Sequence, residues 1–279
     1  MAARLVDHGH SITAWDRAEA AMRGAGPMVQ SVGTAQDVAA AADIILSIIT
    51  DDAGVRQVYR GERGLLSAPV QGKLFIEMST LQPATVRELA VAAQSKGAAL
   101  IDSPVLGSIP TVKDGNLLAL VGGQEADIVR ACTVLDLLTR RVAVMGAVGS
   151  GCATKLAVNL GLATYLQSLS ESLALAIHQG VASDQVLNIL SEAPTANAIL
   201  ASKMAALLGG EVSITLDIAT LRKDVMSAVA TAALSGVPSP CASAALSSLS
   251  VAVAAGWGPR DIGELPRFFR EMMLQRFVA

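Results

Sequence analysis

Hydrophobic residues in the first half of the chain follow two alternating patterns. Short runs rich in Val, Ile and Leu are each followed by a stretch whose apolar residues recur at helical spacing. Strands are predicted at 11–16, 43–49, 73–79, 99–105, 117–121 and 141–145, and helices at 1–9, 17–23, 83–96 and 124–138, with another opening at 50–52. This alternation predicts βαβ units and a mainly parallel, doubly wound sheet, which is an α/β (Rossmann-like) fold.

The second half of the chain has a helical pattern only. Helices are predicted at 150–180, 183–190, 195–208, 215–235, 241–255 and 261–275. Gly146, Gly149 and Gly151 let the chain turn sharply just where this half begins. The sequence therefore predicts two domains, an α/β domain at 1–147 and an all-α helical domain at 148–279.

Composition restricts the classes of function. The chain has 279 residues, a net charge of −3 and only 3% aromatic residues, which argues against nucleic-acid binding. Residues 225–259 carry no charge, but Gly236, Pro238 and Pro240 interrupt the run, and neither part offers the roughly 20 strongly apolar residues of a membrane span. We expect no membrane partner, and instead two helices buried between copies of the chain in a homodimer or larger homo-oligomer.

The cysteines and histidines indicate no metal site. They show neither metal-ligand spacing nor the pattern of a disulfide framework. The residues concerned are Cys132, Cys152, Cys241, His8, His10 and His178. Free thiols fit a reducing compartment, and the first residues lack the apolar core of a secretory signal, so a cytoplasmic protein is expected.

Candidate chemistry lies in the segment that follows the three glycines. Ser150 is placed to cap a helix, and Lys155 and Asn159 are four residues apart on one face of that helix. Their neighbours in sequence are small or apolar, and an apolar environment makes an ammonium a better proton donor, as a general acid requires. A lysine that extends its charged end to solvent from an apolar helix is the alternative, and this helix alone does not decide between the two.

The first predicted strand ends at Asp16, where a dinucleotide-binding domain has the acid that binds the adenosine ribose. That acid follows a G-x-G-x-x-G turn by about 20 residues, and this distance, counted back from Asp16, runs past Met1. We therefore expect a sheet that is missing its first, central strand, and a start of translation upstream of Met1. The alternative is that Asp16 is only a turn residue at the end of a strand.

Four segments in a fixed order resemble a known family. They are 78–80 (Met-Ser-Thr), 102–108 (Asp-Ser-Pro-Val-Leu-Gly-Ser), 149–159 with its glycines and Lys155, and 221–224 (Leu-Arg-Lys-Asp). Together they resemble the β-hydroxyacid dehydrogenases, the group that contains 3-hydroxyisobutyrate dehydrogenase and semialdehyde reductases. The resemblance runs nearly end to end. It implies an NAD(P)-dependent oxidoreductase that transfers a hydride between a nicotinamide cofactor and a small β-hydroxy acid or semialdehyde.

The resemblance also implies roles for individual residues. Lys155 would be the general acid and base, and Asn159 would orient the substrate. Cofactor contacts are implied for Asp16, Arg17, Ile49, Thr50, Thr80 and Lys223, and substrate contacts for Leu106, Gly107 and Ser108. As alternatives, Thr80 caps a turn, and Lys223 forms a solvated ion pair with Asp224.

Specificity is expected to depend on two positions. Asp16 favours NAD, because its carboxylate accepts from a ribose hydroxyl and repels a 2′-phosphate, whereas Arg17 favours NADP. Where the family commonly has a serine that helps to hold the substrate carboxylate, this chain has Leu106. Either Gly107 and Ser108 supply the missing donors, or the substrate is less polar than a small hydroxy acid.

Two other functions remain open. Imine reductases share this architecture but usually replace the catalytic lysine, so Lys155 argues against them. A non-catalytic helical dimerisation remnant would explain the missing glycine-rich turn. The presence of Lys155, Asn159, Thr80 and Lys223 together favours the enzyme.

Overall fold

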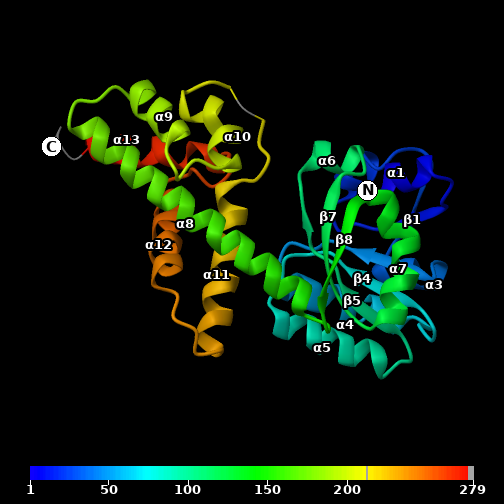
Figure 1. Cartoon of the computed structure of the whole chain (residues 1–279). Helices are drawn as coiled ribbons and strands as arrows, with labels where there is room; N and C mark the ends of the chain where they lie inside the picture. Colours follow the sequence, from blue (N-terminus) through cyan, green and yellow to red (C-terminus); the bar gives the residue numbers. More distant parts are fainter. Residues whose placement is uncertain (212, 276–279) are drawn as a thin grey trace. The chain divides into compact units, whose positions relative to one another are not determined.

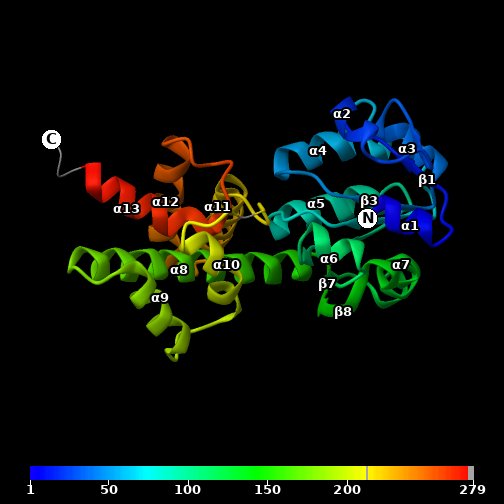
Figure 2. The same cartoon turned by 90° about the horizontal axis from the view of Figure 1, so that it is seen from above.

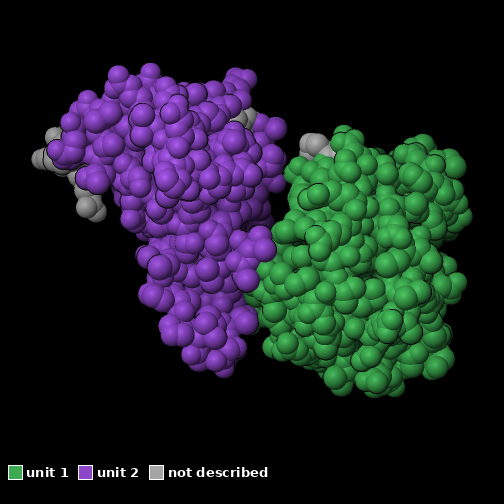
Figure 3. Space-filling view, viewed as in Figure 1, with its two compact units in different colours: residues 1–156 green, residues 157–279 purple. Residues whose placement is uncertain are grey.

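The structure is a computed structural model that describes residues 1–211 and 213–275 (Figure 1). The chain forms two compact units, Met1–Leu156 and Ala157–Ala279, which Figure 3 shows in green and purple. The division falls inside helix α8 (Ser150–His178), whose first turns belong to the first unit. The sequence places the domain boundary slightly earlier, just before this helix, because the change of hydrophobic pattern occurs there.

The first unit is built on a six-stranded sheet with the order β3-β4-β5-β7-β6, in which β8 also pairs with β7. Its strands are β3 (Ile44–Ser47), β4 (Leu74–Glu77), β5 (Ala99–Asp102), β6 (Val105–Leu106), β7 (Leu117–Gly122) and β8 (Thr139–Gly146). The β3–β4, β4–β5 and β7–β8 pairs are parallel, and β7 runs antiparallel to β5 and β6. The predicted α/β fold with a mainly parallel sheet is confirmed. The single strand predicted at 99–105 is two strands, because Pro104 has no N–H for the ladder.

Helices cover both faces of this sheet, so its strands are apolar on both faces. One face packs against α3 (Ala35–Ala41), α4 (Asp52–Arg60) and α5 (Pro83–Gln94), and the other against α7 (Glu125–Leu138). In β4, Phe75 faces the first group, and Leu74 and Ile76 face α7. Figure 2 shows α3 and α4 on one side of the sheet and α7 on the other.

The strand that precedes Asp16 lies apart from this sheet. β1 (Ile12–Ala14) pairs in parallel with β2 (Val29–Ser31), and within the described residues neither strand pairs with β3. Leu5 of α1 (Ala2–Asp7) belongs to a cluster against which Ile12 of β1 and Ile44 of β3 both pack. The sheet is therefore interrupted between β1 and β3, at the place where the sequence predicts a missing strand.

Several short elements were not predicted from the sequence. They are β2, α3, the 3-10 turn η1 (Leu65–Ser67) and α6 (Ile109–Lys113), whereas α2 (Glu19–Arg23) was predicted. β2 has only three residues, two of them polar, so it carries no hydrophobic pattern. α3 had a readable signal, because Thr34 caps it by accepting the Asp37 N–H at Oγ1 over 3.2 Å.

The second unit is helical throughout its described part. Its helices are the rest of α8, α9 (Ser183–Glu192), α10 (Ala198–Leu207), α11 (Ile218–Leu234), α12 (Pro240–Ala254), the 3-10 turn η2 (Ile262–Glu264) and α13 (Leu265–Gln275). α11 and α12 form a hairpin that turns at Gly236, whose φ of +68° suits glycine, and both pack on Leu166 of α8. The predicted break in the uncharged run is thus confirmed. Among the described helices, none combines the length and the apolar character needed to cross a membrane.

Candidate active site

Three adjacent strands of the first unit end in a polar residue on the same face of the sheet. Ser47, Glu77 and Asp102 are the last residues of β3, β4 and β5, and the strand register places them side by side. Glu77 and Asp102 are 0% exposed and Ser47 is 6% exposed. Open α/β sheets bind ligands beyond the carboxyl ends of their strands. This buried row therefore marks the edge of the sheet at which a site is expected.

The Glu77 carboxyl group connects the segments that follow β3 and β4. Ser47 donates from Oγ to Glu77 Oε2 over 2.6 Å, and its hydroxyl lies 2.8 Å from that of Tyr59. Ser79 donates its backbone N–H to Glu77 Oε1 over 2.8 Å, and its Oγ accepts the Ile49 N–H over 2.6 Å. Burial raises the pKa of Glu77 above its ordinary value, although the hydrogen bonds from Ser47 and Ser79 act against this.

The Asp102 carboxyl group holds the start of α8. Asp102 Oδ1 accepts the Gly149 N–H over 2.6 Å, and Oδ2 accepts the Cys152 N–H over 2.7 Å. Such amides at a helix start have no helical partner, and an acceptor there is stabilising. Burial raises the pKa of Asp102, against the opposing effect of these two N–H groups. The side chain thus fixes the end of α8 from which Lys155 projects.

Glycines allow this close approach of helix and sheet. A Cβ on Gly151 would lie 2.1 Å from the Leu120 carbonyl oxygen, and one on Gly122 would lie 2.5 Å from Asp102 Oδ1. Gly149 has a φ of +92°, which side chains rarely adopt. The glycine-rich segment read from the sequence as a turn is therefore also a packing requirement at the start of α8.

Lys155 lies against the chain that leaves β5. Its side chain is half-buried, and its Nζ donates to the Val105 carbonyl oxygen over 2.9 Å. Val105 immediately precedes Leu106, Gly107 and Ser108, so the structure brings the predicted catalytic lysine beside the predicted substrate loop. The bond to a main-chain carbonyl also shows that the ammonium is held by the protein, unlike a lysine that merely extends into solvent.

The substrate loop itself is shaped by local contacts. Leu106 is half-buried in β6, and Gly107 is exposed with a φ of +141°. A Cβ at Gly107 would lie 2.6 Å from Leu117 Cδ2, so glycine is required there. Ser108 engages Thr111 Oγ1 with both its N–H and its Oγ, each over 3.2 Å. These bonds tie Ser108 to the first turn of α6.

A second group of predicted residues is found in the second unit. Asn159, 3% exposed, donates from Nδ2 to Asp224 Oδ2 over 2.7 Å. Lys223 Nζ lies 2.6 Å from Asp224 Oδ1. Asp224 is itself 3% exposed, so its pair with Lys223 is not the solvated ion pair considered from the sequence. The sequence analysis quoted Asp224 in a motif but assigned it no role, because its contact with Asn159 spans 65 positions of the chain.

The predicted ribose-binding residues lie on the surface of the first unit. Asp16 and Arg17 are both exposed. Asp16 Oδ1 accepts the Ala18 N–H over 2.7 Å, which is the turn role considered as the alternative. This bond occupies one carboxylate oxygen, and the second has acceptor capacity of its own.

Thr50 and Thr80 follow the strands β3 and β4, as predicted, and Ile49, predicted as the last residue of its strand, also lies beyond the end of β3. The Ile49 N–H is already bonded to Ser79 Oγ, so of its backbone groups only the carbonyl is left to meet a cofactor. Thr50 is exposed and Thr80 is half-buried. Hydroxyl and carbonyl groups of this kind fit the nicotinamide and ribose parts of a dinucleotide. No described segment between a strand and a helix has the G-x-G-x-x-G spacing of a dinucleotide-binding turn, so we assign no residue to a pyrophosphate.

Two family models match the chain. The NAD binding domain of 6-phosphogluconate dehydrogenase matches residues 1–146, which is more than half of the chain, and the NAD-binding region of NADP-dependent 3-hydroxyisobutyrate dehydrogenase matches residues 149–269. The chain belongs to the β-hydroxyacid dehydrogenase family. The resemblance read from the sequence motifs is therefore confirmed, and the first unit is a domain of the NAD(P)-binding type.

Individual relatives of the chain agree with the family. Human mitochondrial 3-hydroxyisobutyrate dehydrogenase is 32% identical over 68% of this chain, and the match spans only 57% of the human protein. 2-(Hydroxymethyl)glutarate dehydrogenase of Eubacterium barkeri is 27% identical over 98% of this chain and 91% of its own length.

Solved structures extend the likeness to the fold. The structure of Mycobacterium tuberculosis 3-hydroxyisobutyrate dehydrogenase with L-serine has a TM-score of 0.86 and 25% identity, and the match covers 96% of this chain and 94% of that one. An imine reductase from Myxococcus stipitatus, in complex with NADP⁺, has a TM-score of 0.63 and 20% identity over 96% of this chain and 94% of its own. The second likeness shows a shared fold alone.

The described part of the chain contains no group of three or more His, Cys, Asp or Glu side chains that could hold a metal ion. Cys152 lies next to the carboxyl row but is buried, and burial together with the nearby Asp102 charge raises the pKa of its thiol well above the usual value. Because the thiolate is the reactive form of cysteine, this shift disfavours a role for Cys152 as a nucleophile or a metal ligand.

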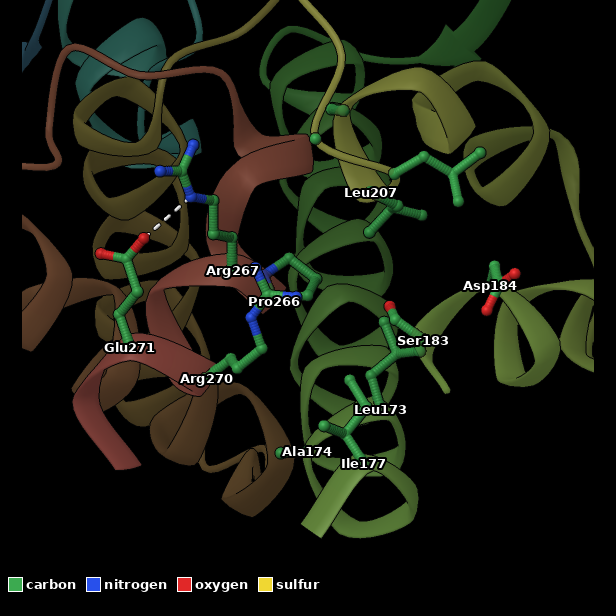
Figure 4. A pocket seen from close by; sticks show the side chains of 13 residues that line it. Leu173, Ala174, Ile177, Ser183, Asp184, Leu207, Pro266, Arg267, Arg270 and Glu271 are labelled. Carbon is green, nitrogen blue, oxygen red and sulfur yellow. Dashed lines mark hydrogen bonds and ion pairs between the residues drawn. The ribbon is translucent and has the colours of Figure 1, made fainter. Parts of the chain in front are cut away.

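One pocket, of about 480 Å³, lies within the second unit (Figure 4). Its lining comes from α8, α9, α10 and α13, and includes the ion pair of Arg267 with Glu271, whose atoms are 2.8 Å apart. None of the residues predicted for catalysis, cofactor binding or substrate binding lines it. We therefore assign it no part in the reaction.

Proposed function

We propose that this β-hydroxyacid dehydrogenase interconverts a small β-hydroxy acid and the corresponding aldehyde acid with NAD(P). The observation that carries the proposal is the 2.9 Å contact of Lys155 Nζ with Val105 O, beside the substrate loop. Asp102 holds the start of the same helix through two amides. A proton donor with a fixed position is what reduction of a carbonyl group requires.

In this mechanism Lys155 moves the proton. A bound nicotinamide supplies or accepts the hydride at the substrate carbon. During reduction, Lys155 Nζ gives a proton to the oxygen that becomes the hydroxyl group, and during oxidation the neutral amine takes that proton back. The Val105 carbonyl orients one of the three N–H groups of the ammonium and thereby directs Nζ.

We assign Asn159 to substrate orientation and Lys223 to a cofactor contact. Asp224 supports both assignments, because it accepts the Asn159 amide over 2.7 Å and pairs with Lys223 over 2.6 Å. Because Asn159 donates to Asp224 through Nδ2, its Oδ1 is left to accept a hydrogen bond from a substrate hydroxyl.

Cofactor binding in this proposal uses Asp16, Arg17, Ile49, Thr50 and Thr80. NAD is favoured over NADP, because the Asp16 carboxylate accepts from a ribose hydroxyl and repels a 2′-phosphate. Arg17 beside it acts in the opposite direction. The ratio of kcat/KM for the two cofactors measures which residue prevails, and a clear advantage for NADP would assign the choice to Arg17.

The substrate is proposed to lie against Leu106, Gly107 and Ser108. The tuberculosis relative was solved with L-serine, a small β-hydroxy acid, which supports this class of substrate. The Leu106 side chain offers no hydrogen bond to a carboxylate, so the donors must come from the Gly107 and Ser108 region. Imine reduction remains the second candidate on the strength of fold alone, and Lys155 argues against it.

The protein is further proposed to be a cytoplasmic homodimer or larger homo-oligomer. The uncharged stretch 225–259, which covers most of the hairpin of α11 and α12, exposes large apolar side chains, with Met226 46%, Leu234 81% and Val251 48% exposed. Such a surface is typical of a contact between proteins. This surface carries no positive charge that could bind the phosphates of a nucleic acid. Free thiols at Cys132 and Cys241 fit a reducing compartment.

A substrate panel tests the proposed activity. NAD⁺ and NADP⁺ reduction would be followed by absorbance with 3-hydroxyisobutyrate, L-serine and other β-hydroxy acids, and with α-hydroxy acids as controls. Cyclic imines would be offered with the reduced cofactors. Turnover of β-hydroxy acids above the α-hydroxy controls is expected. Turnover of imines alone would replace the proposal with the second candidate, and no turnover of any compound would favour the non-catalytic alternative.

A further inference from the structure

A buried carboxyl group at the end of β4 takes no part in the proton transfer proposed above. Glu77 is 0% exposed, and no described lysine, arginine or histidine forms an ion pair with it. Burying such a group is costly unless hydrogen bonds hold it. An acid kept in this position therefore calls for a reason beyond packing.

The hydrogen bonds of Glu77 lead to the two segments that follow β3 and β4. The ladder between these strands ends where the Met78 N–H meets Ser47 O over 2.8 Å. Beyond that point the segments are joined by Ser79, which gives its N–H to Glu77 and accepts the Ile49 N–H at Oγ. Side chains thus continue the connection after the backbone ladder has stopped.

The connection is rigid because each of its members is buried and has more than one partner. Ser79 is 2% exposed and bonds to Glu77 through its N–H and to Ile49 through its hydroxyl. Ser47 links the other carboxyl oxygen to the Tyr59 hydroxyl of α4. Glu77 therefore ties together β3, β4 and α4 just where the sheet edge opens.

We propose that Glu77 and Ser79 form a positioning clamp that presets the cofactor-binding backbone of this enzyme. Thr50 follows Ile49 and Thr80 follows Ser79, so the clamp sets the spacing of the two residues assigned to the cofactor. This inference rests on the proposed function, because it assigns a purpose to the same edge of the sheet. Neither clamp residue touches the reacting atoms, so cofactor affinity depends on the clamp and proton transfer does not.

The variant Ser79→Ala tests the clamp with the least disturbance, because it removes the hydroxyl that accepts the Ile49 N–H. Ser170→Ala is the matched control, since Ser170 is also buried (0% exposed, against 2% for Ser79) and its Oγ donates to Leu166 O over 2.7 Å, within α8. Glu77→Gln is the conservative variant. Its amide oxygen can accept the Ser79 N–H, and its NH₂ can donate to Ser47, whose own hydrogen then turns to Tyr59.

The readouts are the dissociation constants of NADH and NADPH, measured by fluorescence titration of the full chain, and kcat at saturating cofactor. Ser79→Ala should weaken binding about 3- to 10-fold, the range expected for one lost hydrogen bond. Its kcat should stay close to that of the wild type. Ser170→Ala should bind as the wild type does, even if both serine variants lose similar thermal stability. Glu77→Gln should bind nearly as tightly as the wild type.

Amide hydrogen exchange at Ile49 gives a readout that needs no cofactor. Exchange should be faster in Ser79→Ala than in the wild type and unchanged in Ser170→Ala. Wild-type affinity for cofactor in Ser79→Ala, or unchanged exchange at Ile49, would overturn the clamp while leaving the proposed function intact. Failure of the wild-type protein itself to bind either NADH or NADPH would instead reject the proposed function, and the clamp with it.

Discussion

The two units hold their buried carboxyl groups in different ways. In the first unit Glu77 and Asp102 accept N–H and O–H groups and, within the described residues, form no ion pair. In the second unit Asp224 and Asp261 each pair with a lysine. In the first unit hydrogen bonds alone hold the carboxyl group, whereas in the second unit a lysine also compensates its charge. The contrast suggests that the first pair of acids serves the site and that Asp261 serves the fold.

Asp261 shows the second arrangement in full. Its Oδ1 lies 2.8 Å from Lys203 Nζ of α10, and its oxygens also accept the N–H groups of Thr215 and Gly263. Burial acts to raise the pKa of Asp261, but the hydrogen bonds from Lys203, Thr215 and Gly263 outweigh it and hold the pKa below its ordinary value. The network joins α10 to η2 without involving any predicted site residue.

The largest effect is expected from breaking that pair. Lys203→Met keeps the apolar stem but leaves the buried Asp261 unpaired, which should lower the free energy of unfolding by about 3–5 kcal/mol. Chemical denaturation measures the loss, and kcat per folded molecule should not change. Arg267→Met is the control, because its pair with Glu271 is exposed (45% and 39%) and should contribute less than about 1 kcal/mol. A similarly small loss of free energy of unfolding in both variants would show that the buried pair contributes no more than the exposed one.

A smaller but functional effect is expected at Asp102. Asp102→Asn leaves one amide, of Gly149 or Cys152, facing an NH₂ group, at a cost of about 1–3 kcal/mol. Because this loosens the helix start that carries Lys155, kcat should fall by about 10- to 100-fold. Steady-state kinetics at saturating cofactor measures this.

Asn197→Ala is the matched control for Asp102→Asn. Asn197 also accepts two N–H groups at a helix start, those of Ile199 and Leu200 in α10. Its loss should lower stability and spare kcat. Equal losses of kcat in the two variants would show that general loosening, and not the position of Lys155, is responsible.

The smallest effect is expected in how the stability of each unit depends on pH. The raised pKa of Glu77 means that the folded first unit binds a proton more tightly than the unfolded chain. The contribution of Glu77 to the free energy of unfolding therefore grows as pH falls from the raised pKa toward the ordinary value of 4.5. The lowered pKa of Asp261 has the opposite sign, so its contribution is complete above the ordinary value of 3.8 and is lost as pH falls below it.

Tryptophan fluorescence can separate these two contributions. The chain has two tryptophans, Trp15 in the first unit and Trp257 in the second. Variants that keep one tryptophan each report the unfolding of one unit between about pH 3 and pH 6. The signal from Trp257 should show that the second unit loses stability at the acid end of this range. If Lys203→Met abolishes this loss, the loss is assigned to Asp261. Identical pH profiles for both units would contradict the contrast.

Sequence reasoning found the long elements and the family but not the side-chain contacts. The strands 43–49 and 73–79 and the helices of the second unit were predicted because their patterns are long and regular. β2 was missed because three residues carry no period. The roles of Glu77 and Asp102 were missed because each has a partner far away in the chain, at a separation of 30 positions for Ser47 and Glu77 and 47 for Asp102 and Gly149. An acid at the end of an apolar strand was the available signal.

The kinetics of Lys155→Ala test the central claim most directly. Loss of the proton donor should lower kcat by at least about 100-fold, while the dissociation constant for cofactor changes little. A small primary alkylamine added to the assay should restore part of the lost rate, because its ammonium form can occupy the space left by the side chain. Near-normal kcat in Lys155→Ala, or a loss confined to cofactor affinity, would contradict the assignment of Lys155 as the general acid.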